Sequence, residues 1–228
     1  MSNKEVVLNS DKKIHLRENT LDKYIFNEIF KNKVYKKLTL KSDDVVFDIG
    51  ANVGFFALYA SKDVKKVICF EPDKENFSLL EENTSSLDNI ILENKAVIGG
   101  HEKTRTFYLN TKKNKGAHSL YVKRGRQEVT VDCSNINSLL QKYSPNKVKM
   151  DIEGGEREVI YAIKEWSNID ELIFEYHHNV KGQSHKDFYA LIKYLKQIFE
   201  FIDYIHPKKH WTSIVYCKKD KNSLEEWL

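Results

Sequence analysis

Apolar residues change their spacing along the chain, and the spacing predicts the secondary structure. Short apolar runs are typical of buried strands and occur at 44–49, 66–71, 89–94, 146–153 and 171–177. Stretches with apolar residues every three or four positions are typical of amphipathic helices and occur at 54–62, 74–84, 135–143, 155–166 and 184–199. Strand and helix therefore alternate, which is the pattern of a parallel sheet with crossover helices.

The N-terminal part of the chain lies outside this alternation. Residues 5–8 and 13–17 predict a small hairpin. Residues 20–39 carry apolar side chains at helical spacing and predict an amphipathic helix. We therefore expect an N-terminal extension, 1–42, packed on a single compact domain, 43–228.

One internal segment and the C-terminal end also depart from the alternation. Segment 100–131 contains two strand-like runs, 105–110 and 127–132, with a polar and basic stretch between them. We interpret it as an excursion beside the main sheet. Near the C-terminus, 199–205 and 211–217 predict an antiparallel pair that closes an otherwise parallel sheet.

The composition fits a globular protein and excludes some classes of function. Hydrophobic residues make up 41% of the chain and charged residues 31%, which supplies enough apolar material for a core. The net charge is +4 and Arg occurs only five times, so we do not expect nucleic-acid binding. No apolar run of about 18 residues predicts a membrane span, and the N-terminus lacks the apolar core of a signal peptide.

The three cysteines, Cys69, Cys133 and Cys217, lie far apart and form no C-x-x-C pair. This spacing predicts reduced thiols in a cytoplasmic protein and argues against a disulfide framework or a zinc site. The sequence gives no indication of oligomeric state.

The stretch VVFDIGANVGFF (45–56) places one acidic residue and two glycines directly at the end of a predicted strand. In parallel α/β sheets, ligands bind at the carboxyl ends of the strands. Gly50 and Gly54 allow the backbone to turn sharply and to approach a ligand closely. Glu71 closes the next strand, where a carboxylate accepts hydrogen bonds from the two hydroxyls of a ribose. The combination predicts a cofactor that contains a nucleoside.

The loop differs from the known phosphate-binding motifs. It matches neither the dinucleotide pattern G-x-G-x-x-G nor the phosphate loop G-x-x-x-x-G-K-[ST]. Asp48 stands two places before Gly50, where it would repel a pyrophosphate and suit a ligand with an amino group or a sulfonium. An ordinary turn in a domain that binds no ligand is the alternative interpretation.

Five motifs follow one another in the order DIGANVGFF, CFEP (69–72), ENKAVIGG (93–100), VKMDIEGGE (148–156) and FEYHH (174–178). With them, the chain resembles the FkbM family of S-adenosylmethionine-dependent methyltransferases over roughly residues 40–180. The resemblance implies a class I methyltransferase (Rossmann-like) α/β fold. Such a fold has a mostly parallel seven-stranded sheet, an antiparallel C-terminal hairpin and three α/β/α layers. It also implies O-methylation, often of sugars or polyketide hydroxyls.

The resemblance implies a cofactor site as well. The loop after the first strand would bind the methionine end of the cofactor, through Asp48, Gly50, Asn52 and Gly54, with Ala51 and Phe55 in the same loop. Glu71 would hold the ribose. The adenine would be surrounded by Pro72, Asp73, Asn94, Ala96 and Val97. Segment 100–131 has no counterpart in the resemblance, and a role in substrate choice is left open.

Methyl transfer to a hydroxyl needs precise positioning and the help of a base or a metal ion. Asp151 and Glu153 are two residues apart, as are Glu175 and His177, so each pair shares one side if its strand persists. Asp151 is the first choice for contact with cofactor or acceptor. His177 is the favoured base, because an unperturbed pKa of ~6.5 suits that work. Alternatively, Asp151, Glu175 and His177 would bind Mg²⁺ or Mn²⁺.

Simpler interpretations exist for several polar residues. Glu153 and Glu156 both suit the start of a helix, where negative charge is favourable. We expect His118 to be a solvent-exposed loop residue. The basic runs KKNK (112–115) and KRGR (123–126) are typical of a solvated surface, or bind an anionic acceptor such as a phosphorylated or nucleotide-linked sugar.

The predicted function is thus S-adenosylmethionine-dependent O-methylation of a sugar, glycan or small-molecule hydroxyl. An RNA ribose 2′-O-methyltransferase is one alternative, disfavoured by the small net charge and the few arginines. A scaffold that binds a cofactor or a glycan without catalysis is the other.

Overall fold

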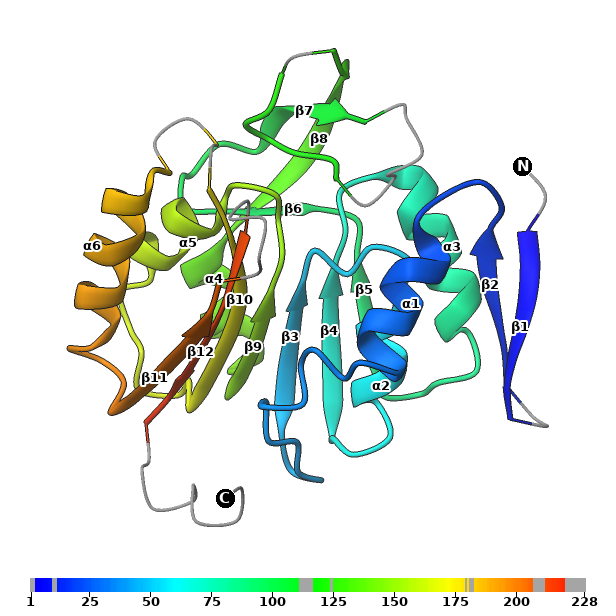
Figure 1. The fold of residues 1–228 in the computed structure, drawn as a ribbon, viewed down its shortest axis with the longest axis horizontal. Coiled ribbons are helices and arrows are strands. Elements are labelled where there is room, and N and C mark those ends of the chain that lie inside the picture. The colour runs from blue at the N-terminus through cyan, green and yellow to red at the C-terminus, as the bar shows by residue number, and fades with distance from the viewer. Residues whose placement is uncertain are drawn as a thin grey trace.

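The computed structural model describes residues 3–9, 12–110, 117–123, 125–178, 180, 183–206 and 212–219. Within them, a seven-stranded sheet has the order β11-β12-β10-β9-β3-β4-β5 (Figure 1). The strand bounds are Val45–Ile49 (β3), Lys66–Phe70 (β4), Ile90–Glu93 (β5), Lys147–Met150 (β9), Glu171–His177 (β10), Phe201–Ile205 (β11) and Thr212–Lys218 (β12). The central strands β5, β4, β3, β9 and β10 are parallel, whereas β12 is antiparallel to both β10 and β11. The predicted fold class is confirmed.

Helices cover both faces of this sheet (Figure 1). On β3, Val46 packs with the helices α1 (Asp22–Phe30), α2 (Phe55–Ala60) and α3 (Lys74–Thr84). Phe47 points to the other face and packs with α4 (Ile136–Tyr143), α5 (Glu156–Ala162) and α6 (His185–Leu195). Because side chains of a strand alternate between its faces, one apolar run supplies two hydrophobic cores.

The N-terminal extension packs on the sheet and on α3. The predicted hairpin is confirmed as β1 (Asn3–Asn9) paired with β2 (Lys12–Arg17). His15 N donates to Asn83 Oδ1 at 2.7 Å, and Thr39 N donates to Glu171 Oε2 at 2.9 Å. These contacts join the extension to α3 and to β10. The division at residue 42 stays a prediction.

Segment 100–131 contributes to a second, smaller sheet. Its two predicted strands are confirmed as β7 (Thr104–Leu109) and β8 (Gln127–Asn135), which pair antiparallel. A short strand that the pattern did not predict, β6 (Ala96–Ile98), pairs parallel with β8. The basic run at 112–115 lies outside the described residues.

Several predicted elements were too long, and two of them bear on the site. The helix predicted over 20–39 ends at Phe30, and Lys33 has the left-handed φ of 51° that a continuous helix excludes. The strand predicted over 146–153 ends at Met150, and Glu153 has a φ of 53°. The argument that Asp151 and Glu153 share one side of a continued strand was therefore wrong.

The cysteine prediction agrees with the structure, because Cys69, Cys133 and Cys217 are unpaired. Among the described residues, none of the helices is long and apolar enough to span a membrane.

Candidate active site

A cavity of about 370 Å³ opens at the carboxyl ends of the parallel strands. Of the predicted site residues, those that line it are Gly50, Ala51, Asn52, Phe55, Glu71, Pro72, Ala96, Val97, Asp151, Glu153 and Glu175. Those that do not line it are Asp48, Gly54, Asp73, Asn94 and His177. The first set contains the groups that a ligand would meet.

The loop after β3 is shaped by a close approach to the loop after β9. Gly50 has a φ of 82°, and a Cβ there would lie 1.8 Å from the backbone oxygen of Asp151. Gly50 N and Ala51 N both donate to Phe70 O at 3.0 Å. A side chain at position 50 would therefore force β3, β4 and β9 to change their relative positions.

Asp48 does not line the cavity as predicted, because Lys149 occupies its carboxylate. Asp48 is fully buried, and Lys149 Nζ donates to Asp48 Oδ1 and to Gly50 O, both at 2.9 Å. Burial opposes the Lys149 charge, but Asp48 and Asp151 outweigh it and raise the pKa of Lys149. The sequence did contain a signal for this pair, since a lysine inside a strand buried on both faces requires a partner.

Glu71 presents a buried carboxylate at the end of β4. Its Oε2 accepts from Asn52 N and its Oε1 from Asp73 N, each at 2.9 Å. Burial raises the pKa of Glu71 to about 7, against the effect of these hydrogen bonds. The carboxylate is therefore fixed in direction and poised between charged and neutral forms near pH 7.

Asp73 and Asn94 support this corner of the cavity from behind. Asp73 Oδ1 accepts from Asn76 N at 2.8 Å and caps α3. Asn94 Nδ2 donates to Glu71 O at 2.8 Å and also reaches Pro72 O. Both side chains hold the loop that carries Glu71.

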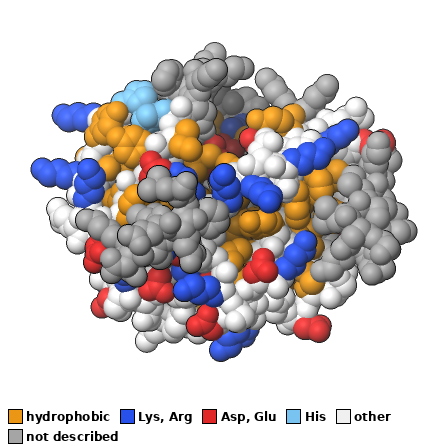
Figure 2. Space-filling model, turned by 60° about the horizontal axis from the view of Figure 1, so that its bottom comes forward, with side chains coloured by type: hydrophobic (Ala, Val, Ile, Leu, Met, Phe, Trp, Pro, Cys, Tyr) orange, Lys and Arg blue, Asp and Glu red, His pale blue; other side chains and the backbone are white. Residues whose placement is uncertain are grey.

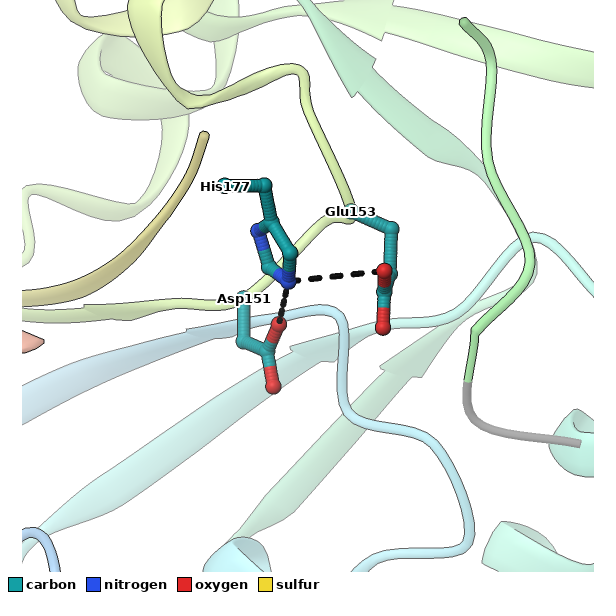
Figure 3. A group of neighbouring side chains, drawn as sticks. All are labelled: Asp151, Glu153 and His177. Carbon is teal, nitrogen blue, oxygen red and sulfur yellow. Dashed lines mark ion pairs between the residues drawn. The ribbon is translucent and has the colours of Figure 1, made fainter. Parts of the chain in front are cut away.

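Three side chains gather where β9 and β10 end: Asp151, Glu153 and His177 (Figure 3). His177 Nε2 lies 3.4 Å from Glu153 Oε2 and 3.9 Å from Asp151 Oδ1. Its other ring nitrogen, Nδ1, lies 2.9 Å from Oε1 of Glu156, which is fully buried. Glu156 also accepts from Ile152 N and Gly154 N, so it orients His177 and the loop together. From the sequence, Glu156 was interpreted only as a residue suited to the start of a helix.

The protonation of this group differs from the prediction for His177. Burial alone would lower the pKa of His177, but Glu156 and Glu153 outweigh it and hold that pKa well above its usual value. Burial and the nearby charge of Asp151 raise the pKa of Glu153 to about 8 and that of Glu175 to about 7. The neighbouring carboxylates therefore favour the protonated form of His177.

His118 is buried, contrary to the prediction of a solvent-exposed loop residue. Its Nδ1 accepts from Asn110 N at 2.8 Å, and its Nε2 lies 3.9 Å from Asp73 Oδ1. His118 and Leu120 line the cavity on the side of Glu71. The excursion thus reaches the predicted cofactor end.

Helix α1 of the N-terminal extension forms the wall at the other end of the cavity. Leu21, Tyr24 and Glu28 line it, and Tyr24 is 60% exposed. Glu28 and Tyr24 lie close enough to Asp151 and Glu175 for charge to act between them. Sequence periodicity identified this helix but gave no signal that it borders the site.

The family model for the FkbM methyltransferase domain matches residues 48–202. The chain belongs to the FkbM methyltransferase family. The predicted resemblance is therefore confirmed. The hairpin and α1 precede the matched residues.

Individual relatives of this FkbM-family protein are distant. Methyltransferase sdnD of Sordaria araneosa is 25% identical over 67% of this chain and 73% of its own. Hexuronic acid methyltransferase AglP of Haloferax volcanii is 26% identical over 53% of this chain and 50% of its own. A solved structure of methyltransferase FkbM from Methylobacillus flagellatus KT shares the fold, with a TM-score of 0.53 at 16% identity. The likeness covers 84% of this chain but 47% of that one.

The contact between Gly50 and Asp151 leads to a stability prediction. Gly50→Ala and Gly125→Ala both place a side chain at a left-handed φ, but nothing lies within 4 Å of the Cβ position at Gly125. We expect Gly125→Ala to lower the free energy of unfolding by about 1–2 kcal/mol. Gly50→Ala should cost about 1–3 kcal/mol more because it also overpacks the strand ends. Urea unfolding measures both; equal losses would contradict the close approach.

Proposed function

We propose that the protein transfers the methyl group of S-adenosylmethionine to a hydroxyl of a sugar, glycan or small molecule. The proposal rests on the two ends of one cavity. Glu71, at one end, is a carboxylate placed to accept hydrogen bonds from ribose hydroxyls, and the acidic side chains of Asp151, Glu153 and Glu175 lie at the other end. The first suits the nucleoside of the cofactor. The second lies beside the place where a sulfonium and an acceptor hydroxyl would meet.

The cofactor would lie along the ends of β3 and β4. Its ribose hydroxyls would donate to Glu71, and its adenine would lie against Pro72, Ala96 and Val97, which line that end. The methionine part would follow the turn at Gly50 towards Asp151. Lys149 neutralises Asp48 beneath this turn, so the sulfonium would face Asp151 and Glu175 rather than Asp48.

The acceptor would enter between α1 and the ends of β9 and β10. Tyr24 offers an exposed ring, and Glu28, Asp151 and Glu175 offer carboxylates that accept hydrogen bonds from hydroxyls. An aromatic face next to acidic acceptors suits a neutral polyhydroxyl compound. The acidic lining works against the alternative of a phosphorylated or nucleotide-linked sugar.

We assign the base to Glu175 rather than to His177. Glu175 lines the cavity and has a pKa of about 7, whereas His177 lies behind the lining and is held protonated by Glu156. His177 would serve as a fixed positive charge that keeps Asp151 and Glu153 in place. Glu175 would take the hydroxyl proton as the acceptor oxygen bonds to the methyl carbon, while the carbon–sulfur bond would break and release the neutral thioether product.

Methyl transfer itself tests the proposed function. The wild-type chain, with radiolabelled S-adenosylmethionine, should label neutral sugars or glycans in preference to hexuronic acids and sugar phosphates. Glu71→Ala should abolish labelling because the ribose contacts are lost. Labelling of RNA but of no sugar would favour the alternative function; labelling of no acceptor, without cofactor binding, would favour the scaffold.

The role of Glu175 has its own test. Glu175→Gln should lower kcat/KM by about 10²–10⁴-fold, the usual range for a positioned base. In the wild type, kcat/KM should fall as the pH drops below about 7, because the base is then protonated. The exposed Glu200→Gln is the matched control and should match the wild type. If kcat/KM of Glu175→Gln still falls below about pH 7, the base must be a group other than Glu175.

A divalent metal ion is the alternative helper. Asp151, Glu153 and His177 each offer one ligand atom, and these atoms lie within 4.8 Å of one another. In this set Glu153 replaces Glu175, which was named from the sequence. Two oxygens and an imidazole suit Mn²⁺ better than Mg²⁺, and an ion there would polarise the acceptor oxygen. Activity retained after dialysis against EDTA would exclude this role, whereas loss restored by Mn²⁺ would establish it.

The face of the molecule drawn in Figure 2 does not support RNA methylation. On the face drawn in Figure 2, Lys and Arg side chains are interspersed with Asp and Glu. A phosphate backbone would favour a continuous basic surface instead.

A further inference from the structure

Arg17 ends strand β2 of the N-terminal hairpin, outside the residues that match the family model. It is only 6% exposed. An arginine is almost never buried without partners, because removing its charge from water is costly. Its partners therefore indicate why the chain places a charge there.

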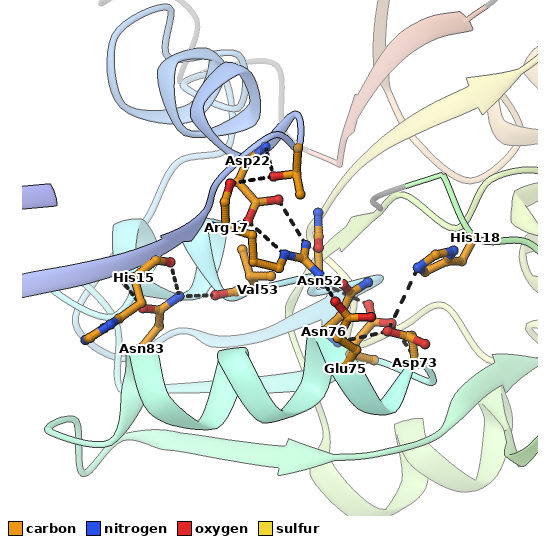
Figure 4. A network of polar contacts seen from close by, with 12 residues as sticks. His15, Arg17, Asp22, Asn52, Val53, Asp73, Glu75, Asn76, Asn83 and His118 are labelled. Atoms are coloured by element: carbon orange, nitrogen blue, oxygen red, sulfur yellow. Dashed lines mark hydrogen bonds and ion pairs between the residues drawn. The ribbon is translucent and has the colours of Figure 1, made fainter. Parts of the chain in front are cut away.

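The guanidinium divides its hydrogen bonds between two side chains (Figure 4). Nε and NH2 donate to the two carboxylate oxygens of Asp22 at 3.0 and 2.9 Å. NH1 donates to Asn76 Oδ1 at 2.7 Å. Asp22 is 1% exposed and neutralises the charge, so the bond to Asn76 is an additional, directed contact.

This contact fixes the orientation of the Asn76 amide. A guanidinium has donors only, so Asn76 must turn its oxygen towards Arg17 and its NH₂ group away. Asn76 is 2% exposed, and its side chain hydrogen-bonds to Glu71. A carboxylate accepts, so the NH₂ group is the donor in that bond. Arg17, Asn76 and Glu71 form a chain in which each contact sets the next.

We propose that Arg17 is a positioning residue for the cofactor, which acts through Asn76 to hold the Glu71 carboxylate ready for the ribose. The inference rests on the proposed function in one respect, the assignment of the ribose to Glu71. Asn52 N, Asp73 N and the Asn76 amide together fix both oxygens of Glu71. The hairpin thereby acts on a binding site that it does not line.

Protonation of Glu71 gives this chain of contacts a measurable consequence. Burial raises the pKa of Glu71 to about 7, whereas the hydrogen bonds from Asp73, Asn52 and Asn76 lower it. Loss of the Asn76 donor should therefore raise that pKa further and leave less carboxylate at neutral pH. The other charged or titratable groups around this corner are Arg17, Asp22, Asp73, Glu75, Lys95 and His118.

The first test follows the Glu71 carboxyl carbon by NMR during a pH titration of the full chain without ligand. Arg17→Lys keeps a positive charge beside Asp22. A single ammonium, however, cannot bind Asp22 and also donate to Asn76 as the planar guanidinium does. Asn76→Asp keeps the acceptor for Arg17 and removes the donor to Glu71. We expect both variants to raise the midpoint by about one pH unit or more, which is a tenfold change in protonation.

Glu75→Gln is the matched control. Glu75 lies 3.7 Å from the same guanidinium but does not line the cavity, so the Glu71 midpoint should not change. Thermal unfolding checks that each variant is folded. A midpoint that stays at the wild-type value in folded Arg17→Lys and Asn76→Asp would overturn the positioning role.

The second test measures the affinity for S-adenosylmethionine by calorimetry between pH 6 and 9. Binding to the carboxylate should weaken as Glu71 is protonated, and in Arg17→Lys this weakening should begin at higher pH. For a midpoint raised by one unit from about 7, about fivefold lower affinity is expected near pH 7, with recovery near pH 9. An equal loss at every pH would indicate a general structural defect and overturn the inference. If the wild type binds no cofactor but the NMR midpoint shifts, the proposed function fails and the contact chain stands.

Discussion

The buried ion pair between Lys149 and Asp48 is the contact on which the arrangement of the site depends. It joins β9 to β3 near the carboxyl ends of these strands, where the cavity opens. The same ammonium also donates a hydrogen bond to Gly50 O. Breaking a buried pair of this kind by removing one partner typically costs about 3–5 kcal/mol, because the other charge is left unpaired. With the pair in place, Gly50 lies directly against the backbone of Asp151. The turn that faces the cofactor and the loop that carries the acidic group are thus set by one interaction.

The two ends of the cavity are built from different parts of the chain. The ends of β3 and β4, together with His118 of the excursion, form the end that contains Glu71. The loop after β9, the end of β10 and helix α1 form the acidic end. The excursion therefore borders the proposed cofactor, and the N-terminal extension borders the proposed acceptor. Differences in acceptor among relatives are then expected to follow the segment before the matched domain.

The fold was predictable because its signals are local. Strand and helix alternate with their own periods, and each strand carries the apolar side chains of two cores. The positions of Glu71 and Gly50 at the cavity were also predictable, since ligands of parallel α/β sheets bind where the strands end. The family motifs then pointed to S-adenosylmethionine as the ligand.

The contacts that were missed join residues far apart in the sequence. Asp48 and Lys149 are separated by 101 positions, and Arg17 and Asn76 by 59. The role of Asp48 was misjudged because its charge was considered without this partner. The pKa of His177 was misjudged for a similar reason: burial lowers it, but Glu156 and Glu153 in the folded chain outweigh burial and raise it. Local patterns identify such residues but do not say which charges surround them.

The most direct test of the account is a calorimetric titration of the wild-type protein with S-adenosylmethionine, with NAD as the comparison ligand. We predict micromolar binding of S-adenosylmethionine and none of NAD, because the loop at Gly50 lacks the dinucleotide pattern and the cavity offers carboxylates near the expected sulfonium. Absence of S-adenosylmethionine binding, or equal binding of NAD, would contradict the placement of the cofactor between Glu71 and Asp151.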